Sequence, residues 1–290
     1  MTLLAIPNLS EGRRSEVVSS LCATLVSAGA RVLDCHSDAV HNRSVITLTG
    51  DGSLLPGALA ALATAASTLD LGRHRGVHPR LGTLDVCPIV PYDEPMVTAV
   101  AVAHQTGMAI NSATGIPVYF YGAAATRPET RELPALRRGG LPELIRRAES
   151  GLAPDIGDTP IDLARGVVCV GARDVLVAFN VWLRCDVTTA RKIARSVRAS
   201  AGGLPGVRSL GLEIDDTPTS QVSMNLIDPA MTNIDEAFNA VAEGARGEGA
   251  EVVGSEIVGL VPERFMPHPN GRAARALIAP GRSLESVLNG

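Results

Sequence analysis

The chain has 290 residues, of which 46% are hydrophobic, 19% charged and 3% aromatic, and its formal net charge is −4 at pH 7. This length favours two domains, and the composition is typical of a globular protein. The acidic balance and the few aromatic side chains argue against a nucleic-acid-binding surface, which needs a basic face or a series of stacking rings.

The cysteines and the N-terminus indicate the cellular compartment. The five cysteines are odd in number and form no C-x-x-C pair, which favours a reducing compartment over a disulfide framework or a zinc finger. The first residues lack the basic flank and the long apolar run of a signal peptide. No uncharged apolar stretch approaches the ~18 residues of a membrane span. We therefore expect a cytoplasmic protein that binds neither membrane nor nucleic acid.

Apolar runs and turn-forming residues predict the order strand, helix, strand, strand, helix, strand for the first 90 positions. The strands are expected at 3–6, 31–33, 45–49 and 84–90, and the helices at about 13–28 and 54–69. Ser10 is expected to cap the first helix, and Gly29 to end it. This βαββαβ order is typical of a sheet whose helices pack on one face.

The rest of the chain adds three elements and then repeats the βαββαβ order. A helix, a strand and a polar helix are expected at 94–108, 117–121 and 132–149, followed by a turn-rich crossing loop at 151–160. Further strands are expected at 167–170, 175–183, 207–214, 221–226 and 251–257, with helices from 188 and at 234–245. We therefore predict an α/β (α+β) fold of two subdomains, 1–172 and 173–290. Each is expected to be a mixed β-sheet with helices on one face, with a ligand cleft between the two.

A cationic loop is predicted immediately before the strand at 84–90. Residues 73–80 contain three arginines and two histidines in an otherwise acidic chain. Gly76 and Pro79 disfavour a regular helix through them, so these cations are not one face of a surface helix. A glycine-hinged cationic loop that enters a buried strand is a common place for anion binding and proton transfer.

Within this loop His78 is the candidate for proton transfer, because an imidazole titrates near neutrality, at about pH 6.5. The alternative is a loop histidine satisfied by backbone carbonyl groups. His74 could orient His78, bind a substrate carboxylate, or simply be solvated. Guanidinium groups bind carboxylates through two parallel hydrogen bonds. The candidates for such a clamp are Arg43, Arg73, Arg75 and Arg80, each of which could instead be a solvated surface residue.

A metal site is the weaker interpretation of the histidines. His36 and His41 could join the loop histidines and Asp38 around a metal, but no pattern of supporting carboxylates accompanies them. We therefore expect no metal. Asp85, in the strand after the loop, is expected to pair with an arginine or to hold a histidine tautomer, and it could equally form a purely structural ion pair.

Short motifs follow one another along almost the whole chain. They are PNLSEGR at 7–13, HNRSV at 41–45, GVHPRLG at 76–82, LDVCP at 84–88, VYFYG at 118–122, PD at 154–155, GAR at 171–173, AFN at 178–180, QVSMNL at 221–226 and GSEIVGLVP at 254–262. In this order they resemble the glutamate formimidoyltransferase (formiminotransferase) family, which transfers a formimidoyl group between formiminoglutamate and tetrahydrofolate.

The resemblance implies a reaction and a site. The reaction would convert N-formimidoyl-L-glutamate and tetrahydrofolate, the co-substrate, to 5-formimidoyltetrahydrofolate and L-glutamate, as in histidine degradation. The resemblance also implies a folate tunnel between the subdomains, a homodimer and a catalytic histidine at His78. Arg43 and Arg80 would stabilise carboxylates or the intermediate. The stretch that matches the family's folate contacts contains Gly157, Thr159 and Gly166. Asn42, Gln221 and Asn225 are further candidates, because their side chains can supply directional hydrogen bonds to a folate. Alternating polar residues at 221–225 also describe any half-exposed strand.

Two positions depart from the family pattern. His36 stands where animal members have an aspartate, so that Asp38 is the nearest carboxylate, and Trp182 stands where the family has an asparagine. The alternatives are therefore a related folate-dependent formyl or formimidoyl transfer with a different amine, an inactive folate-binding homologue, and a metal-dependent hydrolase of the amidine.

The cyclodeaminase that is fused to this domain in animals is not expected in these 290 residues. Another protein would then cyclise the product.

Overall fold

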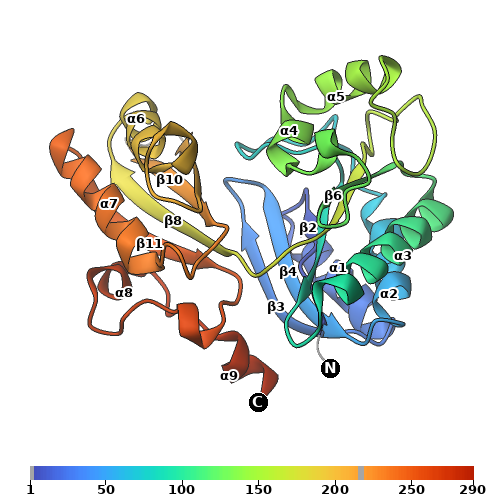
Figure 1. The fold of residues 1–290 in the computed structure, drawn as a ribbon, viewed down its shortest axis with the longest axis horizontal. Coiled ribbons are helices and arrows are strands. Elements are labelled where there is room, and N and C mark those ends of the chain that lie inside the picture. Colours follow the sequence, from blue (N-terminus) through green and yellow to red (C-terminus); the bar gives the residue numbers. More distant parts are fainter. Residues whose placement is uncertain (1–2, 215–218) are drawn as a thin grey trace. The chain divides into compact units, whose positions relative to one another are not determined.

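The computed structural model describes residues 3–214 and 219–290. The chain divides into two compact units, Met1–Arg173 and Asp174–Gly290. Each unit has its own sheet and its own apolar core (Figure 1). The predicted α/β class is confirmed. None of the described helices is long and apolar enough to cross a membrane.

The first unit is built on a seven-stranded mixed sheet. Its strands are β1 (Leu3–Ala5), β2 (Asn8–Leu9), β3 (Arg31–Asp38), β4 (Arg43–Gly50), β5 (Leu84–Pro91), β6 (Val118–Gly122) and β7 (Val168–Ala172). Strands β1 and β2 both pair antiparallel with β4 and β5, and they are separated near Pro7, which has no N–H to give to a ladder. Beyond β5 the sheet continues through the parallel strands β7 and β6. The βαββαβ order predicted for the first 90 residues is therefore present, with two strands added at its edge.

Three helices cover one face of this sheet (Figure 1). They are α1 (Ser15–Ser27), α2 (Leu55–Ala66) and α3 (Met96–Thr114). Leu25 of α1 and Leu59 of α2 are fully buried in one core with Ile46 and Ile89 of the sheet. Removal of these apolar side chains from water is the main force that holds the helices on the strands.

Helices also pack on the opposite face of this sheet, over its parallel part, so the prediction of helices on one face is wrong for this unit. The 3₁₀ turn η1 (Pro128–Thr130), α4 (Leu133–Arg137) and α5 (Gly140–Glu149) follow β6. Leu136 of α4 and Leu144 of α5 pack with Tyr119 and Tyr121 of β6 in a separate small core. Strands buried on both faces have near-continuous apolar sequences, as β5 does over residues 84–90.

The polar helix predicted at 132–149 is instead two helices. Gly139 and Gly140 have φ of 75° and 72°, in the left-handed region where glycine pays no steric penalty. A right-handed helix cannot continue through two such residues, so α4 ends and α5 begins there.

The predicted cap of the first helix is also wrong. The hydroxyl of Ser10 donates to the carbonyl oxygen of Gly82 at 2.7 Å, and α1 begins five residues later. The carboxylate of Glu11 instead accepts the backbone N–H groups of Arg13 and Arg14, both at 2.9 Å. Ser10 therefore ties the start of the chain to the loop before β5.

The second unit has a four-stranded sheet in the order β11-β8-β10-β9. Its strands are β8 (Val177–Arg184), β9 (Val207–Glu213), β10 (Thr219–Leu226) and β11 (Glu251–Val258), and its helices are α6 (Val187–Val197), α7 (Ile234–Gly247), α8 (Arg272–Ala276) and α9 (Leu284–Leu288), with 3₁₀ turns η2 (Ala199–Ala201) and η3 (Glu263–Phe265). All its strand pairs are antiparallel, so the predicted mixed sheet is wrong for this unit. The connection from β8 through α6 to β9 passes over β10, and the connection from β10 through α7 to β11 passes over β8. In each case the strand that is passed over runs antiparallel to its neighbours.

Neighbouring residues of β8 and β10 point to opposite faces of this sheet. Val181 and Val222 belong to the apolar core with α6 and α7, which lie along the sheet (Figure 1). Trp182 and Gln221 are cross-strand partners and point to the other face. The polar residues predicted to bind folate on β10 are therefore on the face away from these two helices.

Candidate functional site

The cationic loop before β5 is irregular, as predicted, and is fixed by other segments. Residues 72–83 contain no helix and form one isolated bridge, between Gly82 and Gly166. Gly76 lies so close to the β3–β4 connection that a Cβ atom would collide with the carbonyl oxygen of His41. The N–H of Val167 donates to the carbonyl oxygen of Leu81 at 2.9 Å. The loop is therefore held from two sides.

Asn42 joins the β3–β4 connection to the loop. Its φ of 48° lies in the left-handed region, which asparagine tolerates better than most residues. Its Oδ1 accepts the N–H of Gly12, and its Nδ2 donates to the carbonyl oxygen of Arg75, both at 3.0 Å. Its own carbonyl oxygen accepts Nε2–H of His74 at 2.8 Å. Asn42 and His74 therefore position the loop, and the predicted contact of Asn42 with folate stays a prediction.

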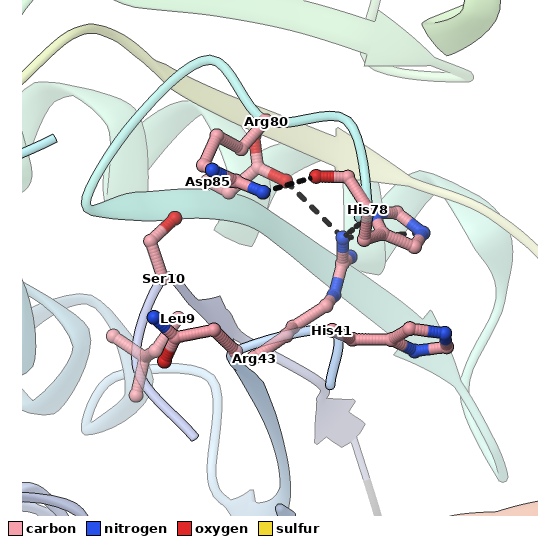
Figure 2. Close-up of a pocket in the computed structure, with 8 residues that line it drawn as sticks. Leu9, Ser10, His41, Arg43, His78, Arg80 and Asp85 are labelled. Carbon is pink, nitrogen blue, oxygen red and sulfur yellow. Dashed lines mark hydrogen bonds and ion pairs between the residues drawn. The ribbon is translucent and has the colours of Figure 1, made fainter. Parts of the chain in front are cut away.

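A small pocket opens beside the loop (Figure 2). Its lining residues are Leu9, Ser10, His41, Asn42, Arg43, His78, Arg80 and Asp85. They come from β2 and the residue after it, the β3–β4 connection, the start of β4, the cationic loop and β5. The structure thus brings together all three residues predicted to be catalytic, His78, Arg43 and Arg80.

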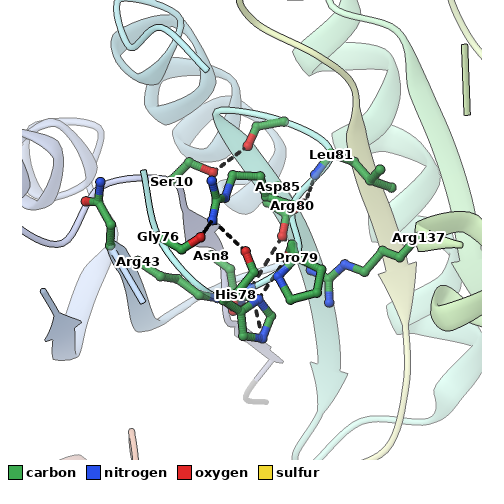
Figure 3. Close-up of polar contacts among 12 residues, drawn as sticks. Asn8, Ser10, Arg43, Gly76, His78, Pro79, Arg80, Leu81, Asp85 and Arg137 are labelled. Carbon is green, nitrogen blue, oxygen red and sulfur yellow. Dashed lines mark hydrogen bonds and ion pairs between the residues drawn. The ribbon is translucent and has the colours of Figure 1, made fainter. Parts of the chain in front are cut away.

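Arg43 and His78 are in direct contact in this pocket (Figure 3). Nη1 of Arg43 lies 2.6 Å from Nδ1 of His78 and 3.5 Å from its Nε2. The same Nη1 lies 3.5 Å from Oδ2 of Asp85. On its other side the guanidinium donates from Nε, at 3.0 Å, and from Nη2 to Oδ1 of Asn8. These contacts direct Nη1 toward the imidazole ring.

Asp85 is the buried carboxylate of the site, with a side chain 2% exposed. Its Oδ2 forms an ion pair with Arg137 at the end of α4, and its Oδ1 accepts the N–H of Leu81 at 2.8 Å. Of the roles predicted for Asp85, the structure shows pairing with arginine. Arg137 was not predicted from the sequence, because it lies 52 residues from Asp85 and stands in none of the motifs.

The pocket has an excess of positive charge, because the guanidinium groups of Arg43, Arg80 and Arg137 surround the single carboxylate of Asp85. Burial, and then the charges of Arg43 and Arg137, lower the pKa of His78 well below its usual 6.5. Burial and the charge of Arg137 lower the pKa of Arg43 to about 10, which leaves its guanidinium charged at pH 7. His78 is therefore a neutral imidazole at pH 7 in surroundings that attract anions.

Arg80 stabilises its own loop. Its Nη2 donates to the carbonyl oxygens of Gly76, at 2.5 Å, and of His78, at 2.6 Å (Figure 3). Burial lowers the pKa of its guanidinium. These bonds fix the backbone that carries His78, and direct binding of a substrate carboxylate by Arg80 stays a prediction.

Asp38, two residues after His36 in the sequence, contacts His41. Its Oδ1 accepts the N–H of His41 at 2.8 Å, and its Oδ2 lies 3.5 Å from Nδ1 of the same residue. The ring centroid of His41 lies 5.8 Å from that of His78. Asp38 therefore bonds His41, whose ring lies beside that of His78. Within residues 3–214 and 219–290, no group of three or more His, Cys, Asp or Glu side chains is arranged to hold a metal ion.

The segment predicted to contact folate ends against the loop. Gly166 has φ of 70°, and a Cβ atom there would collide with the carbonyl oxygen of Leu81. Gly157 has φ of 87° and packs on Pro117, whereas Thr159 is exposed. Backbone geometry explains both glycines, and the folate contacts of these three residues stay predictions.

Gly166→Ala is expected to destabilise the protein by more than the ~1–2 kcal/mol that a left-handed alanine costs, because its Cβ would also displace the backbone of Leu81. Gly202→Ala is the matched control, since Gly202 has φ of 85° but no atom within 4 Å of an added Cβ. Urea unfolding of both variants gives the comparison. Equal losses would contradict the close packing of Gly166 on the loop.

The last two predicted folate residues lie on β10 of the second unit. Gln221 is 1% exposed, and its Oε1 has no hydrogen-bond partner among the described residues. Nε1 of its cross-strand partner Trp182 also has no hydrogen-bond partner within the described parts of the chain. Asn225 is exposed. Buried polar atoms without partners are costly, so this donor and this acceptor are suited to a ligand.

Two family models match nearly the whole chain. The model of the formiminotransferase domain, N-terminal subdomain, matches residues 2–173, and that of the formiminotransferase domain matches residues 178–270. The glutamate formimidoyltransferase of Streptococcus pyogenes serotype M1 is 41% identical over 268 residues, which cover 90% of this chain and 89% of that protein. That of Thermoplasma acidophilum is 40% identical over 268 residues, with 90% and 88% covered. The formimidoyltransferase-cyclodeaminase of Gallus gallus is 36% identical over 273 residues, which cover 90% of this chain and 50% of that protein.

Proposed function

Because this chain belongs to the formiminotransferase family, we propose that it transfers the formimidoyl group of N-formimidoyl-L-glutamate to N5 of tetrahydrofolate. The products are 5-formimidoyltetrahydrofolate and L-glutamate, as in histidine degradation. The observation that carries this proposal is the match of both subdomains, together with glutamate formimidoyltransferases that are 40% and 41% identical over 90% of the chain.

The charge of the pocket supports these substrates. N-formimidoyl-L-glutamate and the glutamate tail of a folate both carry carboxylates. Arg43, Arg80 and Arg137 outnumber the single acid Asp85. Guanidinium groups are the side chains best suited to carboxylates, because they bind both oxygens at once. This arrangement supports Arg43 and Arg80 as stabilisers of a substrate carboxylate or of the charge that develops during transfer.

His78 is suited to the proton transfers of this reaction. The folate supplies an amine nucleophile, which must lose a proton when it attacks the amidine carbon, and the leaving glutamate nitrogen must gain one. A single neutral imidazole can take the first proton and later give it back. The lowered pKa of His78 keeps the ring neutral, and thus able to accept a proton, at pH 7.

Activity is expected to persist at pH 6.5 and to fall only as the pH drops further. The proton-accepting form of His78 is lost as the pH falls through its pKa in the folded protein, which burial and the neighbouring arginines hold below 6.5.

Arg43→Met removes one of the positive charges beside His78, so the pKa of His78 should rise toward 6.5. NMR titration of the His78 ring measures it. The exposed Arg75 provides the control Arg75→Met, and an equal shift in both variants would contradict a local effect.

The assay that tests the proposal combines the protein with N-formimidoyl-L-glutamate, with and without tetrahydrofolate, and follows folate products by mass spectrometry. 5-Formimidoyltetrahydrofolate is expected only when both substrates are present. Loss of the formimidoyl group without folate would indicate a hydrolase. Tight folate binding without transfer from or to any amine would indicate an inactive homologue. Either result would overturn the proposal.

A related transfer to a different amine is the second candidate. It is favoured by Trp182, which stands where the family resemblance leads us to expect asparagine and lies beside Gln221. Comparing glutamate derivatives with other amines in the same assay separates the two candidates. Activity with other amines that exceeds activity with the glutamate derivative would favour the second.

Membership of the family also supports a homodimer that is located in the cytoplasm. Its partners would be small molecules, and neither nucleic acid nor a membrane. Light scattering during gel filtration tests the dimer, with twice the 30.1 kDa chain mass as the expected result. A monomer at assay concentration would contradict it.

A further inference from the structure

Nδ1 of His78 has two neighbours that require opposite forms of the ring. Nη1 of Arg43 lies 2.6 Å from this nitrogen, and the carbonyl oxygen of Pro79 lies 2.8 Å from it (Figure 3). A guanidinium group has only N–H donors, whereas a carbonyl oxygen only accepts. Nδ1 must therefore be bare to bond with Arg43 and protonated to bond with Pro79. It cannot be both at once.

Arg43 determines the form of the ring in the free protein. Its contact is the shorter of the two, and its donor carries a charge, which makes such hydrogen bonds stronger. A neutral His78 then carries its one hydrogen on Nε2. At Nε2 the described residues offer only the same Arg43 nitrogen, at 3.5 Å. In this tautomer His78 can donate from Nε2 but cannot accept a proton there.

Apart from its bond to His78, Nη1 of Arg43 is held only weakly. Its contact with Asp85 is 3.5 Å long, and Asp85 is already bonded by Arg137 and by the N–H of Leu81. The opposite edge is bonded to Asn8 through two nitrogens. A carboxylate that enters the pocket can therefore bond Nη1 in place of His78 while the rest of the side chain stays where it is.

We propose that Arg43 controls the tautomer of His78, and that a carboxylate of the bound substrate releases it. When the carboxylate bonds Nη1, His78 gives its Nε2 proton to water and takes one from water at Nδ1, so that the number of protons is unchanged. Nδ1–H then donates to the carbonyl oxygen of Pro79, and Nε2 becomes a bare nitrogen able to accept the proton of the attacking amine. This proposal rests on the proposed function only for the identity of the anion. Arg43 acts here as a positioning residue.

Nitrogen-15 NMR of the histidine rings tests this directly, because protonated and bare ring nitrogens have distinct shifts and couplings. The probe is glutarate, a dicarboxylate without an amine, titrated into the labelled protein at pH 7.5. Free wild-type protein should show His78 with bare Nδ1, and saturating glutarate should change it to bare Nε2. Arg43→Met should show bare Nε2 without any ligand and no further change with glutarate. Arg75→Met should behave like the wild type, because Arg75 is exposed and, among the described residues, its guanidinium donates to the carbonyl oxygens of Gly72 and His74.

The proposal is overturned if free wild-type protein already has bare Nε2, or if glutarate leaves Nδ1 bare or fails to bind. The wild-type titration needs no variant, so it decides the question even if Arg43→Met does not fold. A chain that changes tautomer with glutarate but transfers no formimidoyl group to tetrahydrofolate keeps this proposal and loses the proposed function. A chain that transfers the group without a change of tautomer keeps the proposed function and loses the tautomer proposal.

Discussion

Replacing His78 with alanine is expected to lower kcat by roughly 10²–10⁴-fold, the usual contribution of a general acid–base residue. The physical reason is that the imidazole of His78 is the group we assign to both proton transfers, which would then fall to water. The KM values for both substrates should change little, because the arginines that attract carboxylates remain. Steady-state kinetics with each substrate varied in turn gives the two parameters.

The exposed His268 provides a matched control for this change. His268→Ala should keep wild-type kcat, and both variants should keep the wild-type circular dichroism spectrum. His78→Ala protein that is folded and turns over at the wild-type rate would remove His78 from the mechanism. The family assignment would survive that result, since it rests on the match of both subdomains.

Replacing Asp85 with alanine is expected to cost about 3–5 kcal/mol of unfolding free energy, as for other buried ion pairs that lose one partner. Its carboxylate is 2% exposed and balances Arg137 and Arg43 while bonding the N–H of Leu81. Without it, two guanidinium groups are left close together with no counter-charge. Urea unfolding followed by circular dichroism measures the loss.

Asp162→Ala is the control for the Asp85 change. Asp162 pairs with Arg165 at 2.8 Å, but these side chains are 46% and 36% exposed, and such a pair is worth at most about 1 kcal/mol. Asp85→Ala combined with Arg137→Met should recover part of the loss, because one of the unpaired charges is then gone. A loss at Asp85 no larger than that at Asp162 would contradict the role of Asp85 as the buried counter-charge.

Much of the fold could be predicted because its signals are local. The apolar run at 84–90 is β5, and the helical spacing of apolar residues locates α1, α2 and α7 to within a few residues. Errors arose where local signals misled. Ser10 has the chemistry of a helix cap but bonds Gly82, and two adjacent glycines divide the helix predicted at 132–149.

The candidate site was predicted only in part. His78, Arg43 and Arg80 stand in motifs, and the structure places all three at one pocket. Arg137 and Asn8 were missed as partners of this pocket. An arginine at the end of a short helix has no distinctive neighbours, and only the packing of α4 brings Arg137 to Asp85.

The sequence by itself determined the order of the elements, the irregular cationic loop and the family, because these depend on periodicity, on glycine and proline, and on motifs that are contiguous in the chain. Only the tertiary structure decided that the second sheet is antiparallel, since strand neighbours depend on which positions the crossovers pass over. It also decided the electrostatics of the site. The low pKa of His78 arises from burial and from the charges of Arg43 and Arg137, and the competition for its Nδ1 is between Arg43 and the carbonyl oxygen of Pro79. Arg43 and Arg137 lie 35 and 59 residues from His78 in the chain, so only the folded structure brings them to its ring.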